Sequence, residues 1–115
     1  MPSSVTKLRQ PTEAQFTRQV IKFAALHGWR TAHFRPARTK DGWRTAVSGQ
    51  GKGFPDLVLL KDSRIIIAEL KVGYGKCTKE QLNWIFAWER TPAKCFIWRP
   101  EDWPLIEKEL SQKQP

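Results

Sequence analysis

Cysteine, histidine and long apolar runs are scarce in this 115-residue sequence. It contains two cysteines and two histidines, and Cys77 and Cys95 lack the CxxC spacing and partner histidines of a zinc site. No apolar run approaches the roughly 18 residues of a membrane-spanning helix, and the N-terminus has no apolar stretch typical of a signal peptide. We therefore expect reduced thiols, no membrane partner, and a cytoplasmic location in a bacterial or virus-infected host cell, not secretion.

Acidic residues are also few. Eleven Asp and Glu stand against 20 Lys and Arg, giving a net charge of +9 and an isoelectric point near 10.0. Residues 1–52 hold ten basic residues and two acids, whereas residues 53–115 hold ten basic residues and nine acids. This excess indicates a polyanionic partner, most often a nucleic acid. The candidate nucleic-acid contacts are Arg35, Arg38, Lys40, Arg44, Lys52 and Lys76.

The pattern of elements predicts a single domain over residues 1–115, with a core over about residues 12–110. Apolar residues at helical spacing predict a helix over residues 11–27, with Thr12 as N-cap and Gly28 after its end. The order α-β-β-β-α-β-α indicates an α/β or α+β fold, a small mixed sheet flanked by helices. The later elements are expected at residues 29–35 (strand), 55–72 (hairpin), 78–90 (helix), 93–98 (strand) and 101–112 (helix). Residues 37–41 read as a basic loop, and residues 43–47 suit a second short strand.

Two short apolar runs within residues 55–71 predict a β-hairpin that turns at Asp62-Ser63. This turn places Asp56 opposite Glu69. Opposed residues share one face of a sheet, and the side-chain period of two adds Lys71 to that face. Opposed carboxylates repel each other unless something compensates them. The compensator is either a divalent cation with oxygen ligands or a structural salt bridge to the lysine.

These residue types suit metal-assisted hydrolysis. Oxygen ligands without His or Cys select Mg²⁺ or Mn²⁺, and Glu13, on the apolar face of the first predicted helix, supplies a third acid. Such an ion polarises a phosphoryl oxygen and lowers the pKa of bound water. Lys71 would orient that water or stabilise the charge of the transition state. With a basic N-terminal half, this predicts hydrolysis of a phosphodiester.

Four short motifs follow one another along the chain: Glu13, Gly53-Phe54-Pro55-Asp56, Glu69-Leu70-Lys71 and Gln81. In order and spacing they resemble the virus-type replication-repair nuclease (VRR-NUC) branch of the PD-(D/E)XK nuclease superfamily. The resemblance runs from Glu13 to about Trp98 and implies a restriction-endonuclease-like core. It implies that Asp56, Glu69 and the Leu70 backbone carbonyl bind the metal, and that Glu13 reaches it directly or through water. It further implies that Lys71 is the catalytic lysine and that Gln81 lies at the edge of the site.

The resemblance also implies an activity and partners. Stand-alone members of this branch resemble Holliday-junction resolvases. We therefore expect a Mg²⁺-dependent, structure-selective DNA endonuclease that cuts branched DNA as a homodimer, in DNA repair, with Mn²⁺ as a substitute ion. The alternatives are a catalytically silent DNA-binding module of the same fold and a restriction-type duplex endonuclease. Retention of Asp56, Glu69 and Lys71 together argues against the silent module.

Several residues keep two interpretations. Thr78 and Gln81 form a capping-box pattern, which alone explains Gln81. The glycines over residues 48–53 suit either a flexible linker or a backbone that passes close to phosphates. Trp84 faces either the site or a partner, and His33 and Arg35 either contact DNA or belong to an exposed strand face. Three further tryptophans belong either to a dimer interface or to the core of the monomer: Trp88, Trp98 and Trp103.

Overall fold

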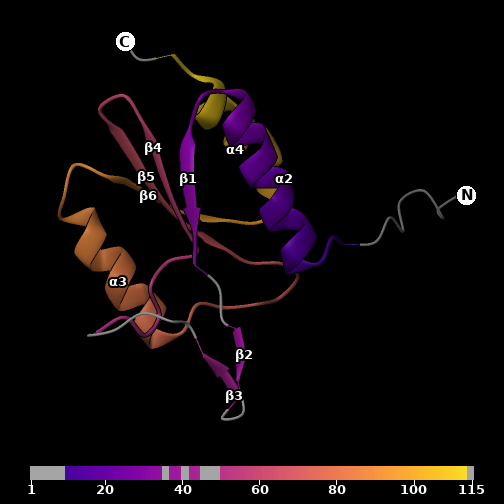
Figure 1. The fold of residues 1–115 in the computed structure, drawn as a ribbon, viewed down its shortest axis with the longest axis vertical. Coiled ribbons are helices and arrows are strands. Elements are labelled where there is room, and N and C mark those ends of the chain that lie inside the picture. Colours follow the sequence, from indigo (N-terminus) through magenta and orange to yellow (C-terminus); the bar gives the residue numbers. More distant parts are fainter. Residues whose placement is uncertain (1–9, 35–36, 40–41, 45–49, 114–115) are drawn as a thin grey trace, which may run out of the picture.

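The computed structural model describes residues 10–34, 37–39, 42–44 and 50–113, with the backbone alone at 37–39 and 42–44 (Figure 1). None of the helices in these ranges is long and apolar enough to cross a membrane. In chain order the elements are α2 (Glu13–Leu26), β1 (Arg30–His33), β2 (Ala37–Thr39), β3 (Gly42–Arg44), β4 (Leu57–Lys61), β5 (Arg64–Leu70), α3 (Lys79–Glu89), β6 (Lys94–Trp98), the 3₁₀ turn η1 (Pro100–Asp102) and α4 (Trp103–Ser111).

The main sheet has four strands in the order β1-β4-β5-β6. The β1–β4 and β4–β5 pairs are antiparallel, whereas β5 and β6 are parallel and are connected through α3. This is the small mixed sheet flanked by helices that the sequence predicted, and its elements follow the predicted order. The antiparallel ribbon β2–β3 is an addition between β1 and β4, and lies below the sheet in Figure 1. The predicted order of the whole chain is therefore matched only roughly.

The β4–β5 hairpin has the predicted register. Leu57 pairs with Ala68 at one end, and Leu60 pairs with Ile65 near the turn. Asp62 makes the turn with a φ of 55°, a left-handed conformation that Asp tolerates better than most side chains. The alternation of side chains along both strands then fixes which residues face each side of the sheet.

Strand β5 lies inside the sheet and is apolar on both faces. Ile66, Ala68 and Leu70 pack in the larger hydrophobic cluster with residues of α2 and α4. Ile67 packs in a smaller cluster with Ile85 of α3. Helices α2 and α4 therefore cover one face and α3 covers the other, as Figure 1 shows. Burial on both sides explains the continuous apolar run in this strand.

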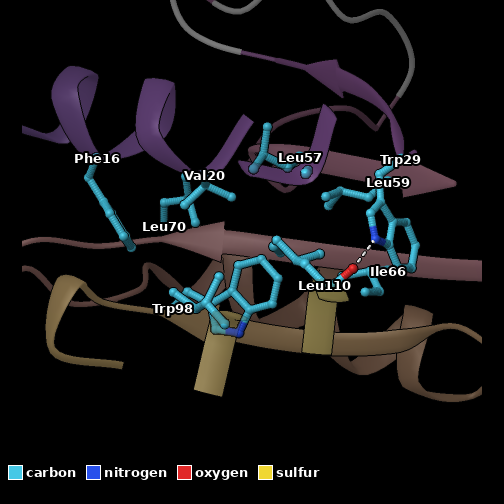
Figure 2. Packing of buried hydrophobic residues seen from close by; sticks show 12 residues of the cluster. Phe16, Val20, Trp29, Leu57, Leu59, Ile66, Leu70, Trp98 and Leu110 are labelled. Atoms are coloured by element: carbon cyan, nitrogen blue, oxygen red, sulfur yellow. Dashed lines mark hydrogen bonds between the residues drawn. The ribbon is translucent and has the colours of Figure 1, made fainter. Parts of the chain in front are cut away.

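Helix α2 carries one wall of the larger cluster and begins where its sequence predicts. The Thr12 hydroxyl accepts a hydrogen bond from Gln15 N, and the Gln15 side chain accepts one from Thr12 N, which is a capping box. Phe16 and Val20 are fully buried and pack over the sheet (Figure 2). Removing such side chains from water contributes roughly 1.5–3 kcal/mol each. This packing also fixes the first turn of the helix, where Glu13 lies.

The tryptophans with two interpretations, Trp88, Trp98 and Trp103, pack against other residues of the chain. Trp98 is 3% exposed in the larger cluster, and Trp103 packs against that cluster. Trp88 packs against the smaller cluster, although its buried Nε1 has no hydrogen-bond partner among the described residues. Trp29 is also buried, and its Nε1 donates to the Leu110 carbonyl at 2.8 Å (Figure 2). The packing of Trp88, Trp98 and Trp103 therefore favours a place in the core over a dimer interface.

Trp29 and Trp88 form a matched pair for testing what a buried indole N–H contributes. Trp29→Phe leaves the buried Leu110 carbonyl without its donor, so we expect the free energy of unfolding to fall by roughly 1–3 kcal/mol beyond the loss of ring area. Trp88→Phe removes a buried donor that has no partner within the described chain, so its cost should be smaller. Urea denaturation of both variants measures the difference, and equal costs would contradict this account of Trp29.

Candidate functional site

A cavity of about 250 Å³ lies at the end of the β4–β5 hairpin that is opposite its turn. It is lined by the start of α2, the segment before β4, the end of β5 and the start of α3. Segments far apart in the sequence therefore meet around one small space. The motif residues in its lining are Glu13, Gly53, Phe54, Asp56, Glu69, Lys71 and Gln81.

Asp56 and Glu69 are brought together at this cavity. The register of the hairpin, continued by one residue beyond Leu57 and Ala68, places them opposite each other. Each carboxyl group lies close enough to influence the pKa of the other. Asp56 Oδ2 also accepts a hydrogen bond from the Leu70 N–H at 2.8 Å, which ties the segment before β4 to the end of β5. The sequence predicted this juxtaposition from the turn position alone.

The Glu69 carboxyl is almost fully buried, with 1% of the residue exposed. Its Oε2 accepts a hydrogen bond from Gln81 Nε2 at 2.9 Å and lies 3.6 Å from Lys71 Nζ. Its Oε1 is buried without a hydrogen-bond partner among the described residues. A buried carboxylate oxygen without a partner is costly, so this atom marks a place where a positively charged or hydrogen-bonding group is missing.

Burial raises the pKa of the acids around the cavity. For Glu69 the loss of water contact is the largest cause, Asp56 adds to it and Lys71 opposes it, and the pKa rises to about 8. Burial also raises the pKa of Asp56, although the hydrogen bond from Leu70 N acts in the opposite direction. Partial burial and the Asp56 charge raise the pKa of Glu13. Burial therefore disfavours two full negative charges at this cavity, where a cation would be favoured.

Gln81 caps helix α3 and also contacts Glu69. Its Oε1 accepts a hydrogen bond from Thr78 N at 2.8 Å, and its backbone N–H donates to Thr78 Oγ1, which completes the capping box of α3. Its Nε2 donates to Glu69 from the same side chain. One amide therefore starts the helix and orients a carboxylate of the site.

The donors at the cavity fit a hard divalent ion. Asp56 and Glu69 supply converging oxygen atoms, and Mg²⁺ is typically held by one or two carboxylates and several waters. In the described ranges no three His, Cys, Asp or Glu side chains are arranged to hold a metal ion. Glu13 lines the same cavity from the start of α2. Leu70 is anchored beside the pair by its N–H.

The structure explains why the Gly-x-Pro-Asp motif begins with glycine at position 53. Its φ is 81°, which favours glycine. A Cβ at this position would lie 2.6 Å from the backbone carbon of Glu80, so no side chain fits between this loop and α3. The segment before Asp56 therefore rests directly on the first turn of the helix that carries Gln81.

Trp84 holds the same segment from the side. Its Nε1 donates to the carbonyls of Gln50 and Lys52, at 3.1 Å each. Phe54 packs edge-on between Trp84 and Phe34, with ring centroids 4.9 Å and 5.0 Å apart. Trp84 therefore faces the loop beside the site, and residues 50–53 of the glycine-rich segment are packed against α3 and do not form a free linker.

Sequence reasoning missed three residues that line the cavity: Phe34, Thr78 and Glu80. The Phe34 N–H donates to the Asp56 carbonyl at 2.8 Å, which extends the pairing of β1 with β4 by one step. His33, the residue before it, favours the ionised form of Asp56 through its charge. The antiparallel pairing of the strand over 29–35 with the hairpin was the signal that could have placed both residues.

The predicted nucleic-acid contacts are only partly described. Lys52 is exposed and lines the cavity, and Lys76 is exposed on the loop that follows β5. Arg38 lies in β2 and Arg44 lies in β3, where only the backbone is described. Arg35 and Lys40 lie outside the described residues.

Known proteins offer no further guide to this site. No family model matches the chain, and no curated protein is significantly similar to it in sequence. The function must therefore be inferred from the residues around the cavity.

The raised pKa of Glu69 predicts a pH-dependent stability. A carboxyl whose pKa is higher in the folded chain binds its proton more strongly there. Its contribution therefore favours folding at low pH and is lost as the pH rises from about 4.5 to about 8. We expect the free energy of unfolding, measured by urea denaturation without divalent ions, to fall over this range. Glu69→Gln should reduce the fall because an amide does not titrate.

Glu107→Gln on the exposed side of α4 is the matched control and should keep the wild-type dependence on pH. An identical fall in Glu69→Gln and in the wild type would show that another group causes it.

Proposed function

We propose that this protein is a Mg²⁺-dependent nuclease that hydrolyses phosphodiester bonds of DNA. Asp56 and Glu69 are its metal ligands and Lys71 is its catalytic lysine. One observation carries the proposal: the buried Glu69 and the half-buried Asp56 share a cavity with a lysine, and one oxygen of Glu69 has no hydrogen-bond partner within the described chain. Groups with strongly shifted pKa values in a cavity are candidates for function.

A purely structural salt bridge between Glu69 and Lys71 explains less of this arrangement than a metal site does. The Glu69–Lys71 contact uses Oε2, which already accepts a hydrogen bond from Gln81. It leaves the second oxygen of Glu69 without a hydrogen-bond partner among the described residues. An ion pair built only for stability has no reason to place a second carboxyl against the first.

The residues around the cavity have distinct roles in the proposed reaction. The Leu70 N–H orients Asp56, and Gln81 orients Glu69. These two carboxylates would hold Mg²⁺, which would polarise a phosphoryl oxygen and lower the pKa of a water molecule. The Lys71 side chain is 13% exposed, so its ammonium is held in place to stabilise the negative charge that develops on the phosphate oxygens. Glu13, whose pKa is raised, exchanges protons with water at the mouth of the cavity.

The proposed substrate follows from the charge of the chain. The ten basic residues among the first 52 residues favour a polyanion, and Lys52 and Lys76 bring positive charge to the cavity and to the loop beside it. The finer part of the proposal is structure-selective cutting of branched DNA by a homodimer, with Mn²⁺ as a substitute ion. The four-motif resemblance supports that part.

A catalytically silent DNA-binding module is the second candidate. It is favoured by the absence of a third converging ligand side chain in the described ranges and by the contact that already pairs Lys71 with Glu69. Metal binding and cleavage separate the two candidates, and each has its own measurement.

Metal binding predicts a stabilisation that does not depend on activity. An ion that binds only the folded chain raises its stability by about 2.7 kcal/mol at 100 times its dissociation constant. We expect Mg²⁺ at pH 8 to raise the melting temperature of the wild type, where the carboxyl pair would otherwise repel, and Asp56→Asn to remove the shift. Glu107→Gln should keep it. An equal shift in Asp56→Asn would place the ion elsewhere.

Cleavage tests the catalytic role of Lys71. With Mg²⁺, the wild type should nick at least one member of a panel of four-way junctions, flaps, duplexes and single strands. Lys71→Ala should lose about 10²–10³-fold in rate while its melting temperature and DNA affinity stay close to the wild-type values. Lys61→Ala, at the turn end of the same hairpin, is the control and should remain active. Failure of the wild type on the whole panel with both Mg²⁺ and Mn²⁺ would reject the nuclease and favour the silent module.

A further inference from the structure

A tight turn of residues 72–75, named the Tyr74 turn, follows Lys71 directly. The Gly75 N–H donates to the Val72 carbonyl at 3.1 Å and closes the turn. Gly73 has a φ of 57°, which suits the first central position of a turn that requires glycine. Tyr74 occupies the second central position, at the tip.

Arg99 fixes this turn to the sheet. Its Nη1 donates to the Gly73 carbonyl at 3.1 Å and its Nη2 to the Gly75 carbonyl at 2.6 Å. The backbone of Arg99 is itself fixed, because its N–H donates to Asp102 Oδ2 at 2.9 Å. A guanidinium that bonds two carbonyls at once defines both position and orientation. The tip of the turn is therefore presented on a firm support.

The tyrosine at this tip has no packing role. Tyr74 is the only tyrosine of the chain, and it is 100% exposed. The turn lies against the proposed catalytic lysine, because a Cβ at Gly75 would be 3.7 Å from Lys71 Cδ. An aromatic ring is thus held open to solvent on the turn that follows Lys71.

We infer that Tyr74 stacks on an unpaired base of the nucleic-acid substrate, next to the phosphodiester that reaches Lys71. The inference rests on the proposed function and extends it to the choice of substrate. Every base has a face on which an aromatic ring can stack, and such contacts need no particular sequence. The turn belongs to a stretch of the chain, residues 70–79, that contains three lysines and no acid, and such a basic stretch favours a nucleic acid over a basic or apolar partner.

The geometry selects a class of DNA. Inside a continuous duplex both faces of each base are covered by its neighbours, so the ring finds no partner there. An unpaired base in a single strand, a flap or an open junction leaves a face free for Tyr74. Because Arg99 already holds the turn, stacking orders little additional chain and retains most of its free energy.

The test uses the full chain with Lys71→Ala, so that bound DNA is not cut. The probe is an oligonucleotide with 2-aminopurine, whose fluorescence is quenched on stacking, placed either in a single-stranded flap or inside a duplex. We expect quenching in the flap and none in the duplex. Adding Tyr74→Ala should remove the quenching and weaken flap binding by about 5- to 150-fold, with duplex affinity changed less than about twofold. Tyr74→Phe should retain both quenching and affinity, because the ring and not the hydroxyl stacks.

Leu26→Ala is the control, another exposed apolar side chain (74% exposed) at the end of α2 remote from Glu13. It should change neither quenching nor affinity. The inference is overturned if Tyr74→Ala binds and quenches like its parent, or if it weakens flap and duplex binding equally. It is also overturned if Tyr74→Ala only turns a dimer into a monomer in sedimentation, because the ring would then contact a second copy of the chain.

These outcomes are distinguishable from failure of the proposed function. Quenching that depends on Tyr74 in a protein that cuts nothing would reject the nuclease and keep the stacking contact. Cleavage of flaps that is unaffected by Tyr74→Ala would keep the nuclease and reject the contact.

Discussion

The antiparallel register between β4 and β5 is the constraint on which the rest of this structure depends. In this register Leu57 and Leu59 face the larger cluster, and the same alternation turns Glu69 toward Gln81 of α3. A slip of one residue would exchange the two faces of a whole strand. The core under α2 and the acids of the cavity would then be lost together, so one ladder of hydrogen bonds specifies both.

The acids of the site lie beside an apolar core, in which a charged group is unfavourable. Placing the Glu69 carboxyl in an almost fully buried position costs hydration free energy, and the raised pKa is the measure of the part that remains uncompensated. Compensation comes from separate elements: Gln81 from α3 and Lys71 from beyond the end of β5. Asp56 draws on a backbone N–H of the neighbouring strand. Such convergence requires the whole fold to be in place before the acids are tolerated.

Local patterns predicted the parts of this molecule that depend on local physics. Alternating apolar residues and a two-residue turn were sufficient to place Asp56 opposite Glu69, and capping residues gave the starts of α2 and α3. A short strand was expected near β3, but strand β2, its pairing with β3 and the clamp made by Trp84 were not predicted. The indole of Trp84 meets carbonyls more than 30 positions away in the chain, and that contact depends on where α3 packs. Gln81 lies between these cases, because spacing revealed its capping oxygen whereas only the assembled fold brings its nitrogen to Glu69.

The double use of Gln81 couples two motions that most proteins keep separate. Its oxygen holds the first turn of α3 and its nitrogen holds Glu69, so neither contact can be released without disturbing the other. Helix ends open far more often than the centre of a sheet. The frequency with which Glu69 can reorient is therefore governed by the fraying of a helix terminus, even though the carboxylate itself belongs to the most deeply buried strand of the chain.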